Sequence, residues 1–138
     1  MIYFNNVTKN YGDSMALDDI TFTVTAGEFV SVVGHSGAGK TTLTKMILAD
    51  AVPTDGTVFF ESINVHKLKN HDLTKLRRRI GVVFQDFKLL ANKTAYENIA
   101  FAMESAGKSD EEIATDVPHV LVLVDLGHKI LHFPHQMS

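Results

Sequence analysis

The stretch Gly34-His35-Ser36-Gly37-Ala38-Gly39-Lys40-Thr41 carries most of the information about the fold of this chain. It matches the pattern G-x-x-x-x-G-K-[ST] in full, which chance would produce in roughly half a per cent of chains of this length and composition. An apolar run at residues 29–33 precedes it, and apolar residues at helical spacing follow it. The motif therefore lies between a predicted strand and a predicted helix, as its chemistry requires.

Each residue type in this phosphate-binding loop (P-loop) has a role in holding the phosphates of a nucleotide. Gly37 and Gly39 leave backbone amides free of side-chain bulk, so the amides and the start of the next helix can surround an anion. Lys40 brings a positive charge to the β and γ phosphates, and the Thr41 hydroxyl is a hard oxygen ligand for Mg²⁺. The alternative is a glycine-rich turn without a ligand. The residues expected to bind Mg·ATP are Gly34, His35, Ser36, Gly37, Ala38, Gly39, Lys40, Thr41 and Thr42.

The segment before the motif is expected to be rich in β-structure. Alternating apolar residues predict two half-buried strands, the first with Ile2, Phe4 and Val7, the second with Ile20, Phe22 and Val24. A turn signal at residues 11–14 separates them, and another follows at 26–28. The apolar run at 29–33 predicts a third strand covered on both faces, as in a parallel α/β sheet.

After the motif, the pattern alternates between helix and strand. It predicts a helix over 40–49, a turn at 53–56, a strand through Val58 and Phe60, a short helix over 72–79 and a strand over 80–84. Two capping boxes, beginning at Thr94 and Ser109, predict helices over about 94–106 and 109–125. Pro118 is expected to kink or restart the second of these helices.

The composition excludes several classes of function. The 138 residues are 45% hydrophobic and 21% charged, as in a globular domain, and 13 Lys and Arg against 16 Asp and Glu argue against a general nucleic-acid binder. The absence of Cys excludes disulfides and thiolate metal sites. No stretch reaches the roughly 20 apolar residues of a spanning helix, and no signal peptide is visible. We therefore expect a cytoplasmic protein that meets a membrane only through a partner.

The residues around the motif resemble the ATP-binding subunits of ABC transporters. Thr8-Lys9-Asn10-Tyr11, Ala16-Leu17 and Gly27-Glu28-Phe29 precede the P-loop in the order typical of that family. The resemblance implies that Tyr11 stacks on adenine and that Gln85, at the family's Q-loop position, contacts Mg²⁺ and the attacking water. Without the resemblance, Tyr11 would be a strand-end aromatic and Gln85 a polar residue at the end of a strand.

The resemblance also implies a fold and a domain organisation. The implied fold is an α/β P-loop NTPase, an ABC-type nucleotide-binding domain with an N-terminal antiparallel β subdomain and the start of a helical subdomain. Residues 1–92 would form the β subdomain with the P-loop core, and residues 93–138 the helical part. Met137-Ser138 resembles the first two residues of the family's signature motif, so the domain is expected to be incomplete. The family's Mg²⁺-binding aspartate, catalytic glutamate and switch histidine would lie beyond it, so we expect these 138 residues to bind ATP without hydrolysing it.

Within the family, residues 78–90 and 94–102 are most similar to the ATPase subunit of a bacterial cell-division complex. This implies an integral membrane partner, a homodimer of ATP-binding subunits in the full-length protein, and a peripheral location on the inner face of the cell membrane. Residues 86–90 would receive a helix of that partner, although three large apolar residues in five also fit a buried turn. ATPases of lipoprotein-release and macrolide-type exporters, and a nucleotide-binding module without hydrolysis, remain alternatives.

Three further patterns have simpler interpretations. The basic run at residues 75–79 is typical of a solvated helix face rather than a nucleic-acid site. His128, His132 and His135 have near-helical spacing, but Pro134 interrupts it, so a metal site is not favoured. Phe101, Met103 and the apolar run at 120–124 are expected in a core.

Overall fold

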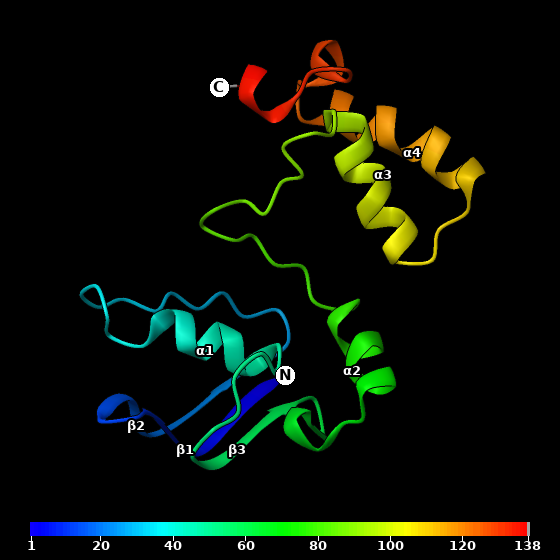
Figure 1. Cartoon of the computed structure of the whole chain (residues 1–138). Helices are drawn as coiled ribbons and strands as arrows, with labels where there is room; N and C mark the ends of the chain where they lie inside the picture. Colours follow the sequence, from blue (N-terminus) through cyan, green and yellow to red (C-terminus); the bar gives the residue numbers. More distant parts are fainter. Residues whose placement is uncertain (138) are drawn as a thin grey trace. The chain divides into compact units, whose positions relative to one another are not determined.

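The computed structural model describes residues 1–137, which form two compact units, Met1–Ile80 and a second that begins at Gly81 (Figure 1). The first unit contains the P-loop and the sheet, and the second is helical. The predicted division into subdomains after residue 92 stays a prediction.

A four-stranded antiparallel sheet with the order β2-β1-β3-β4 forms the base of the first unit. Its strands are β1 (Ile2–Tyr11), β2 (Ser14–Val24), β3 (Asp55–Phe60) and β4 (Ile63–Asn64). A tight turn joins β1 to β2, and its Gly12 takes a φ of 59° that suits glycine. The two strands and the turn predicted before the motif, and the strand through Val58, are therefore confirmed.

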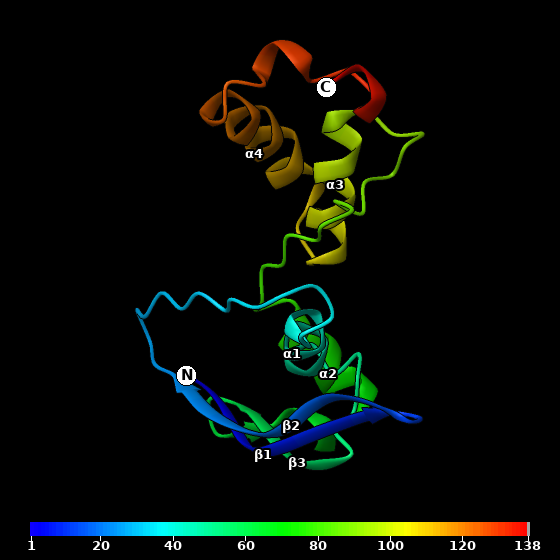
Figure 2. The same cartoon turned by 90° about the vertical axis from the view of Figure 1, so that its left-hand side faces the viewer.

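The helix α1 (Lys40–Ile47) follows the P-loop and lies over one face of the sheet in both views (Figure 1 and Figure 2). The short helix η1 (Val65–Lys67) and helix α2 (Asn70–Arg77) complete the unit. Side chains from strands and helices meet in one core, in which Phe4, Val7, Met46 and Val58 are fully buried. The predicted helices at 40–49 and 72–79 are present, with ends shifted by two residues.

Polar side chains hold the turn that follows α1. Arg77 of α2 donates from Nε to the Leu48 carbonyl at 2.8 Å and pairs with the Asp50 carboxylate at 2.6 Å. His66 of η1 donates from Nε2 to the Ala51 carbonyl at 2.9 Å. The Nδ1 atom of His66 is buried without a hydrogen-bond partner in the described part of the chain. Burial lowers the pKa of His66, because a second proton would have to sit on this unpartnered nitrogen.

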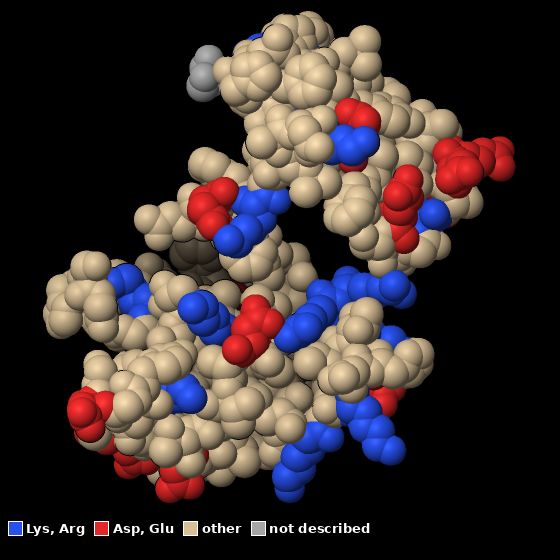
Figure 3. All heavy atoms as spheres, viewed as in Figure 1, with Lys and Arg blue, Asp and Glu red and all other residues tan. Residues whose placement is uncertain are grey.

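The basic run before residue 80 lies on an exposed face. Figure 3 shows Lys and Arg side chains around α2. Several of them are paired with acids: Arg79 contacts the Glu61 carboxylate at 2.6 Å, and Lys75 lies 3.7 Å from Asp72. The arrangement agrees with a solvated helix face.

The second unit is built on two helices with capping boxes, α3 (Ala95–Ser105) and α4 (Asp110–Leu123). The short helices η2 (Gly127–Lys129) and η3 (Pro134–Gln136) follow. Backbone bonds from Ala95 to the His132 carbonyl (2.8 Å) and from Tyr96 to the Ile130 carbonyl (3.0 Å) tie this later segment to the start of α3. Both predicted helices are confirmed, and α4 runs through Pro118 without restarting.

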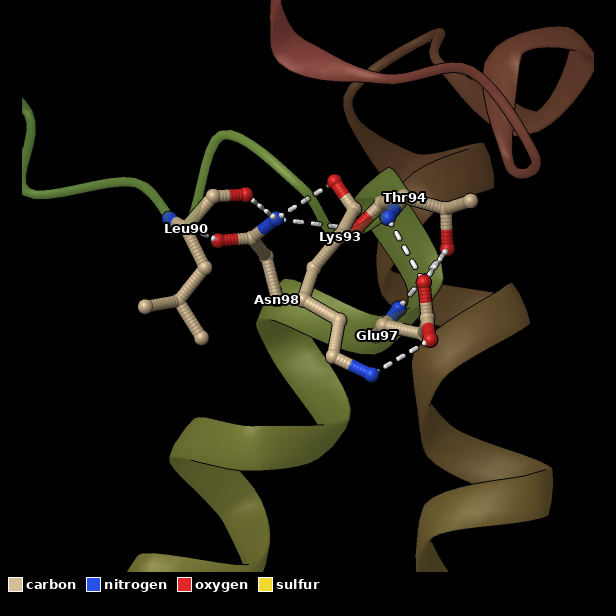
Figure 4. Close-up of polar contacts among 5 residues, drawn as sticks. All are labelled: Leu90, Lys93, Thr94, Glu97 and Asn98. Atoms are coloured by element: carbon tan, nitrogen blue, oxygen red, sulfur yellow. Dashed lines mark hydrogen bonds and ion pairs between the residues drawn. The ribbon is translucent and has the colours of Figure 1, made fainter.

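The cap of α3 is a small network (Figure 4). The Thr94 hydroxyl accepts from the Glu97 amide at 3.2 Å, and the Glu97 carboxylate accepts from the Thr94 amide at 2.8 Å and from Lys93 at 2.9 Å. These bonds lower the pKa of Glu97 to about 2, the Thr94 amide contributing most. Asn98 accepts from the Leu90 amide at 2.8 Å, so the chain entering the helix is fixed as well.

Two predicted strands, at residues 29–33 and 80–84, are wrong. Both segments are irregular, and in residues 1–137 neither pairs with a strand. Phe29 is 94% exposed and Val83 is 92% exposed, so neither segment is buried throughout. An apolar run signals a tendency to be buried, whereas a strand also needs a neighbour for its backbone N–H and C=O groups.

The expected core at residues 120–124 is also largely wrong. Leu121 is buried against Ile113, Val117 and the residues of α3, but the four valine and leucine neighbours of Leu121 are exposed. Phe101 is exposed too, and Met103 packs at the edge of the core. In the described part of the chain, no helix is both long and apolar enough to cross a bilayer.

Candidate nucleotide-binding site

The P-loop places the start of α1 where an anion can approach it. Gly39 caps the helix in the left-handed conformation, with a φ of 82°, and no side chain bonds to the cap. The first intrahelical bond runs from the Leu43 amide to the Gly39 carbonyl at 3.1 Å. The amides of Lys40, Thr41 and Thr42 therefore belong to a first turn that has no intrahelical acceptor for them. Such amides, together with the positive end of the helix dipole, attract phosphate.

Gly39 also lets the loop touch the sheet. A Cβ atom at this position would lie 2.3 Å from the Ala16 carbonyl oxygen and 2.8 Å from a methyl group of Leu17, both in β2. Gly37 shares the left-handed backbone, with a φ of 83°, but nothing lies within 4 Å of its missing Cβ. The loop therefore packs on β2 at Gly39, whereas at Gly37 it is the left-handed backbone, and not a close neighbour, that favours glycine.

Lys40 points its ammonium group at the loop itself. Its Nζ donates to the Gly34 carbonyl at 2.7 Å and to the His35 carbonyl at 2.6 Å. Among the described residues, no carboxylate forms an ion pair with Lys40. The positive charge therefore has only neutral acceptors here, and an anion in the loop would be a stronger partner.

The loop is further shaped by its own backbone. The Ala38 amide donates to the His35 carbonyl at 3.2 Å, and the His35 ring contacts the Ser36 carbonyl at 2.8 Å through Nδ1. Residues Gly34 to Ala38 are exposed. Their backbone groups are therefore accessible to a ligand.

The two threonines of α1 differ in exposure. Thr41 is exposed, so its hydroxyl is available to a metal ion, whereas Thr42 is only 9% exposed and can offer its backbone amide. Among residues 1–137, no group of three or more His, Asp or Glu side chains could hold a metal ion. One hydroxyl fits Mg²⁺ that is bound mainly by phosphate oxygens and water.

Tyr11 stands at the end of β1, next to the part of β2 that supports the P-loop. The β1–β2 register pairs Tyr11 with Ser14 and Lys9 with Leu17, which is a contact of Gly39. The Tyr11 side chain is 48% exposed, and the Lys9 ammonium lies 4.8 Å from the centre of its ring. The structure thus brings Tyr11 and the P-loop to the same end of one hairpin.

Gln85 belongs to the second unit, where it begins the exposed turn at residues 85–88. Its contact with Mg²⁺ and water stays a prediction. The sequence alone missed Lys9, which lies over the Tyr11 ring. The signal that would have found it is the spacing of two residues, which puts Lys9 and Tyr11 on the same face of a strand.

A P-loop that opens a helix beside an antiparallel sheet defines a nucleotide-binding domain of the P-loop class. Residues 17–138 match the sequence model of the ABC transporter family, and the chain belongs to this family. The chain is similar to the cell division ATP-binding protein FtsE of Mycobacterium tuberculosis (45% identity over 140 residues) and of Escherichia coli (41% over 139). The whole chain is covered in both cases, and it spans 61% and 63% of these relatives.

A solved structure supports the fold. MJ0796, described as a bacterial ABC transporter cassette in a dimeric form, aligns with a TM-score of 0.88 at 36% identity, over 100% of this chain and 63% of the other. The predicted fold class, an ABC-type P-loop NTPase with an antiparallel β sheet and helices, is therefore confirmed, as a partial N-terminal portion of that fold.

Proposed function

We propose that these 138 residues hold Mg·ATP as the nucleotide-binding part of an ABC-type ATPase subunit. The observation that carries the proposal is the Lys40 ammonium group, held by the Gly34 and His35 carbonyls at the start of a helix whose Gly39 cap has no side-chain hydrogen bond. On binding, Lys40 exchanges these carbonyls for β and γ phosphate oxygens, and the amides of Gly37–Thr42 surround the phosphates. Thr41 offers its hydroxyl to Mg²⁺, and Tyr11 offers its ring to adenine.

Equilibrium titration with a fluorescent ATP analogue and Mg²⁺ tests this site. Lys40→Ala should weaken binding about 10- to 150-fold, because a charge-assisted contact contributes roughly 1.5–3 kcal/mol. Lys45→Ala is the matched control, since it removes the same charge from an exposed position on the same helix. Equal affinity in the wild type and Lys40→Ala would refute the site.

For turnover, we propose that the full-length protein hydrolyses ATP as a homodimer and that the 138 residues alone do not. Phosphoryl transfer needs a positioned water as well as charge neutralisation. Gln85 is the only catalytic residue that the family resemblance assigns within these residues. A phosphate-release assay on the 138 residues should therefore show no turnover, whereas the nucleotide titration should show binding. Release that disappears in Lys40→Ala would contradict this proposal.

We further propose that the subunit acts in cell division with an FtsX-like integral membrane protein, which holds it at the cytoplasmic face of the membrane. The name of the relatives in M. tuberculosis and E. coli supports this proposal. So does the turn after Gln85: Phe87 is 71% exposed and has a φ of 54°, an unfavourable backbone for a bulky residue, and Leu89 is 53% exposed. A strained, exposed aromatic residue fits a docking anchor better than a buried turn.

Co-purification of the full-length protein with its membrane partner tests this docking site. Phe87→Ala should abolish co-purification and leave ATP affinity nearly unchanged. Leu131→Ala, at a 73% exposed position in the same unit, is the control and should retain the partner. If Phe87→Ala retains the complex or unfolds the protein, the docking proposal is wrong.

A further inference from the structure

Lys9 makes two contacts at once. Its Nζ donates to the Val52 carbonyl at 2.7 Å and lies 4.8 Å from the centre of the Tyr11 ring. A cation at this distance from an aromatic face is attracted by the electrons of the ring. The hydrogen bond to Val52 fixes the ammonium group, so one face of Tyr11 is held against a fixed charge.

The backbone beneath this pair is fixed to the segment that follows α1. The Thr54 amide donates to the Thr8 carbonyl at 2.8 Å, and the Asn10 amide donates to the Thr54 hydroxyl at 3.0 Å. With the bond from Lys9 to Val52, three hydrogen bonds join residues 8–10 to residues 52–54. The end of β1 is therefore anchored to the exit of the P-loop helix immediately before Tyr11.

We infer that Lys9 is a positioning residue that covers one face of the Tyr11 ring and leaves the opposite face as a platform for the nucleotide base. This inference rests on the proposed nucleotide site. Lys9 does not contact the base or the phosphates, but acts through the orientation of Tyr11. Its removal should weaken the contribution of the base to binding and leave the contribution of the phosphates unchanged.

The two contributions are separated by titrating the 138-residue chain with Mg·ATP and with magnesium tripolyphosphate, which has no base. Lys9→Met keeps the length of the side chain without the charge, and it should weaken ATP binding about two- to five-fold, in line with an exposed cation–π contact. Tripolyphosphate affinity should stay as in the wild type. Lys9→Arg keeps the charge and should bind ATP as the wild type does. Lys67→Met removes an equal charge at an exposed position and should leave the affinity for both ligands unchanged.

A double-mutant cycle with Tyr11→Ala separates positioning from a general structural effect. Once the ring is gone, Lys9→Met should weaken ATP binding no further. The inference is overturned if Lys9→Met leaves ATP affinity unchanged, or if it lowers the affinity for tripolyphosphate as much as the affinity for ATP. It is also overturned if Lys9→Met lowers ATP affinity as much in the Tyr11→Ala background as in the wild type. In those cases the proposed nucleotide site is still supported if Lys40→Ala lowers the affinity for both ATP and tripolyphosphate. If the wild type binds neither ATP nor tripolyphosphate, the proposed nucleotide-binding function itself is wrong.

Discussion

Gly37 and Gly39 share a left-handed backbone, but only Gly39 has neighbours where a side chain would begin. Alanine at position 37 therefore costs only the free energy of holding an L-residue in the left-handed conformation. Alanine at position 39 must also displace the Ala16 carbonyl and a methyl group of Leu17. The motif predicts both glycines, but the packing of Gly39 on β2 involves residues more than 20 positions apart, and the sequence pattern does not contain that contact.

We predict that Gly37→Ala destabilises the chain by about 1–2 kcal/mol, the cost of a left-handed L-residue. Gly39→Ala should cost roughly 2–5 kcal/mol, because steric overlap with β2 adds to the same backbone penalty. Urea unfolding of the two variants measures the difference. Equal losses of stability in Gly37→Ala and Gly39→Ala would show that the P-loop does not pack on β2 at Gly39.

At the scale of elements, sequence patterns whose partners lie within a few residues predict the structure more reliably than patterns that depend on distant segments. The capping boxes at Thr94 and Ser109 predict where α3 and α4 begin, because all their partners lie within four residues. The apolar runs at residues 29–33 and 80–84 predict strands that are not there, because strand pairing depends on distant segments that a local pattern does not specify. The predicted helix over 40–49 extends two residues past the end of α1 at Ile47, since Ala49 takes a φ of 53° that a helix cannot include.

The capping boxes predict a pH dependence of the helical unit. Hydrogen bonds lower the pKa of Glu97 and of Glu112 to about 2 from 4.5, so the folded unit binds fewer protons than the unfolded chain between these values. The stability from both caps is complete above pH 4.5 and is lost as the pH falls toward 2. Circular dichroism during acid unfolding should show this loss.

The double variant Glu97→Gln, Glu112→Gln is the control for the caps. Glutamine retains an oxygen that can accept from the cap amide but does not titrate. The loss between pH 4.5 and 2 should therefore be smaller in this variant. An unchanged acid profile would exclude the two glutamates as its source.

At the scale of the whole chain, the two units have separate cores, one around Phe4, Val7 and Val58 and the other around Val117 and Leu121. Burial lowers the pKa of His66, which belongs to the first unit. The folded first unit therefore binds fewer protons than the unfolded chain just below pH 6.5, and its stability falls as the pH drops below that value. The second unit should keep its stability until its glutamates titrate.

Native-state hydrogen exchange at pH 7.5 and 5.5 separates the two units, because it reports opening free energies residue by residue. We predict that the free energy of opening at Val7 and Val58 falls between these pH values, while that at Val117 and Leu121 does not. His66→Gln should abolish the change in the first unit. A parallel fall in both units would contradict the assignment to His66.

The central claim is that the P-loop at Gly34–Thr41 holds the phosphates of ATP, and amide NMR of the 138-residue chain tests it most directly. Addition of Mg·ATP should shift the ¹H–¹⁵N resonances of Gly37, Gly39, Lys40, Thr41 and Thr42 more than any others outside the Tyr11 region. These shifts should be lost or strongly reduced in Lys40→Ala at the same nucleotide concentration. Shifts that are largest elsewhere, or that persist unchanged in Lys40→Ala, would contradict the account.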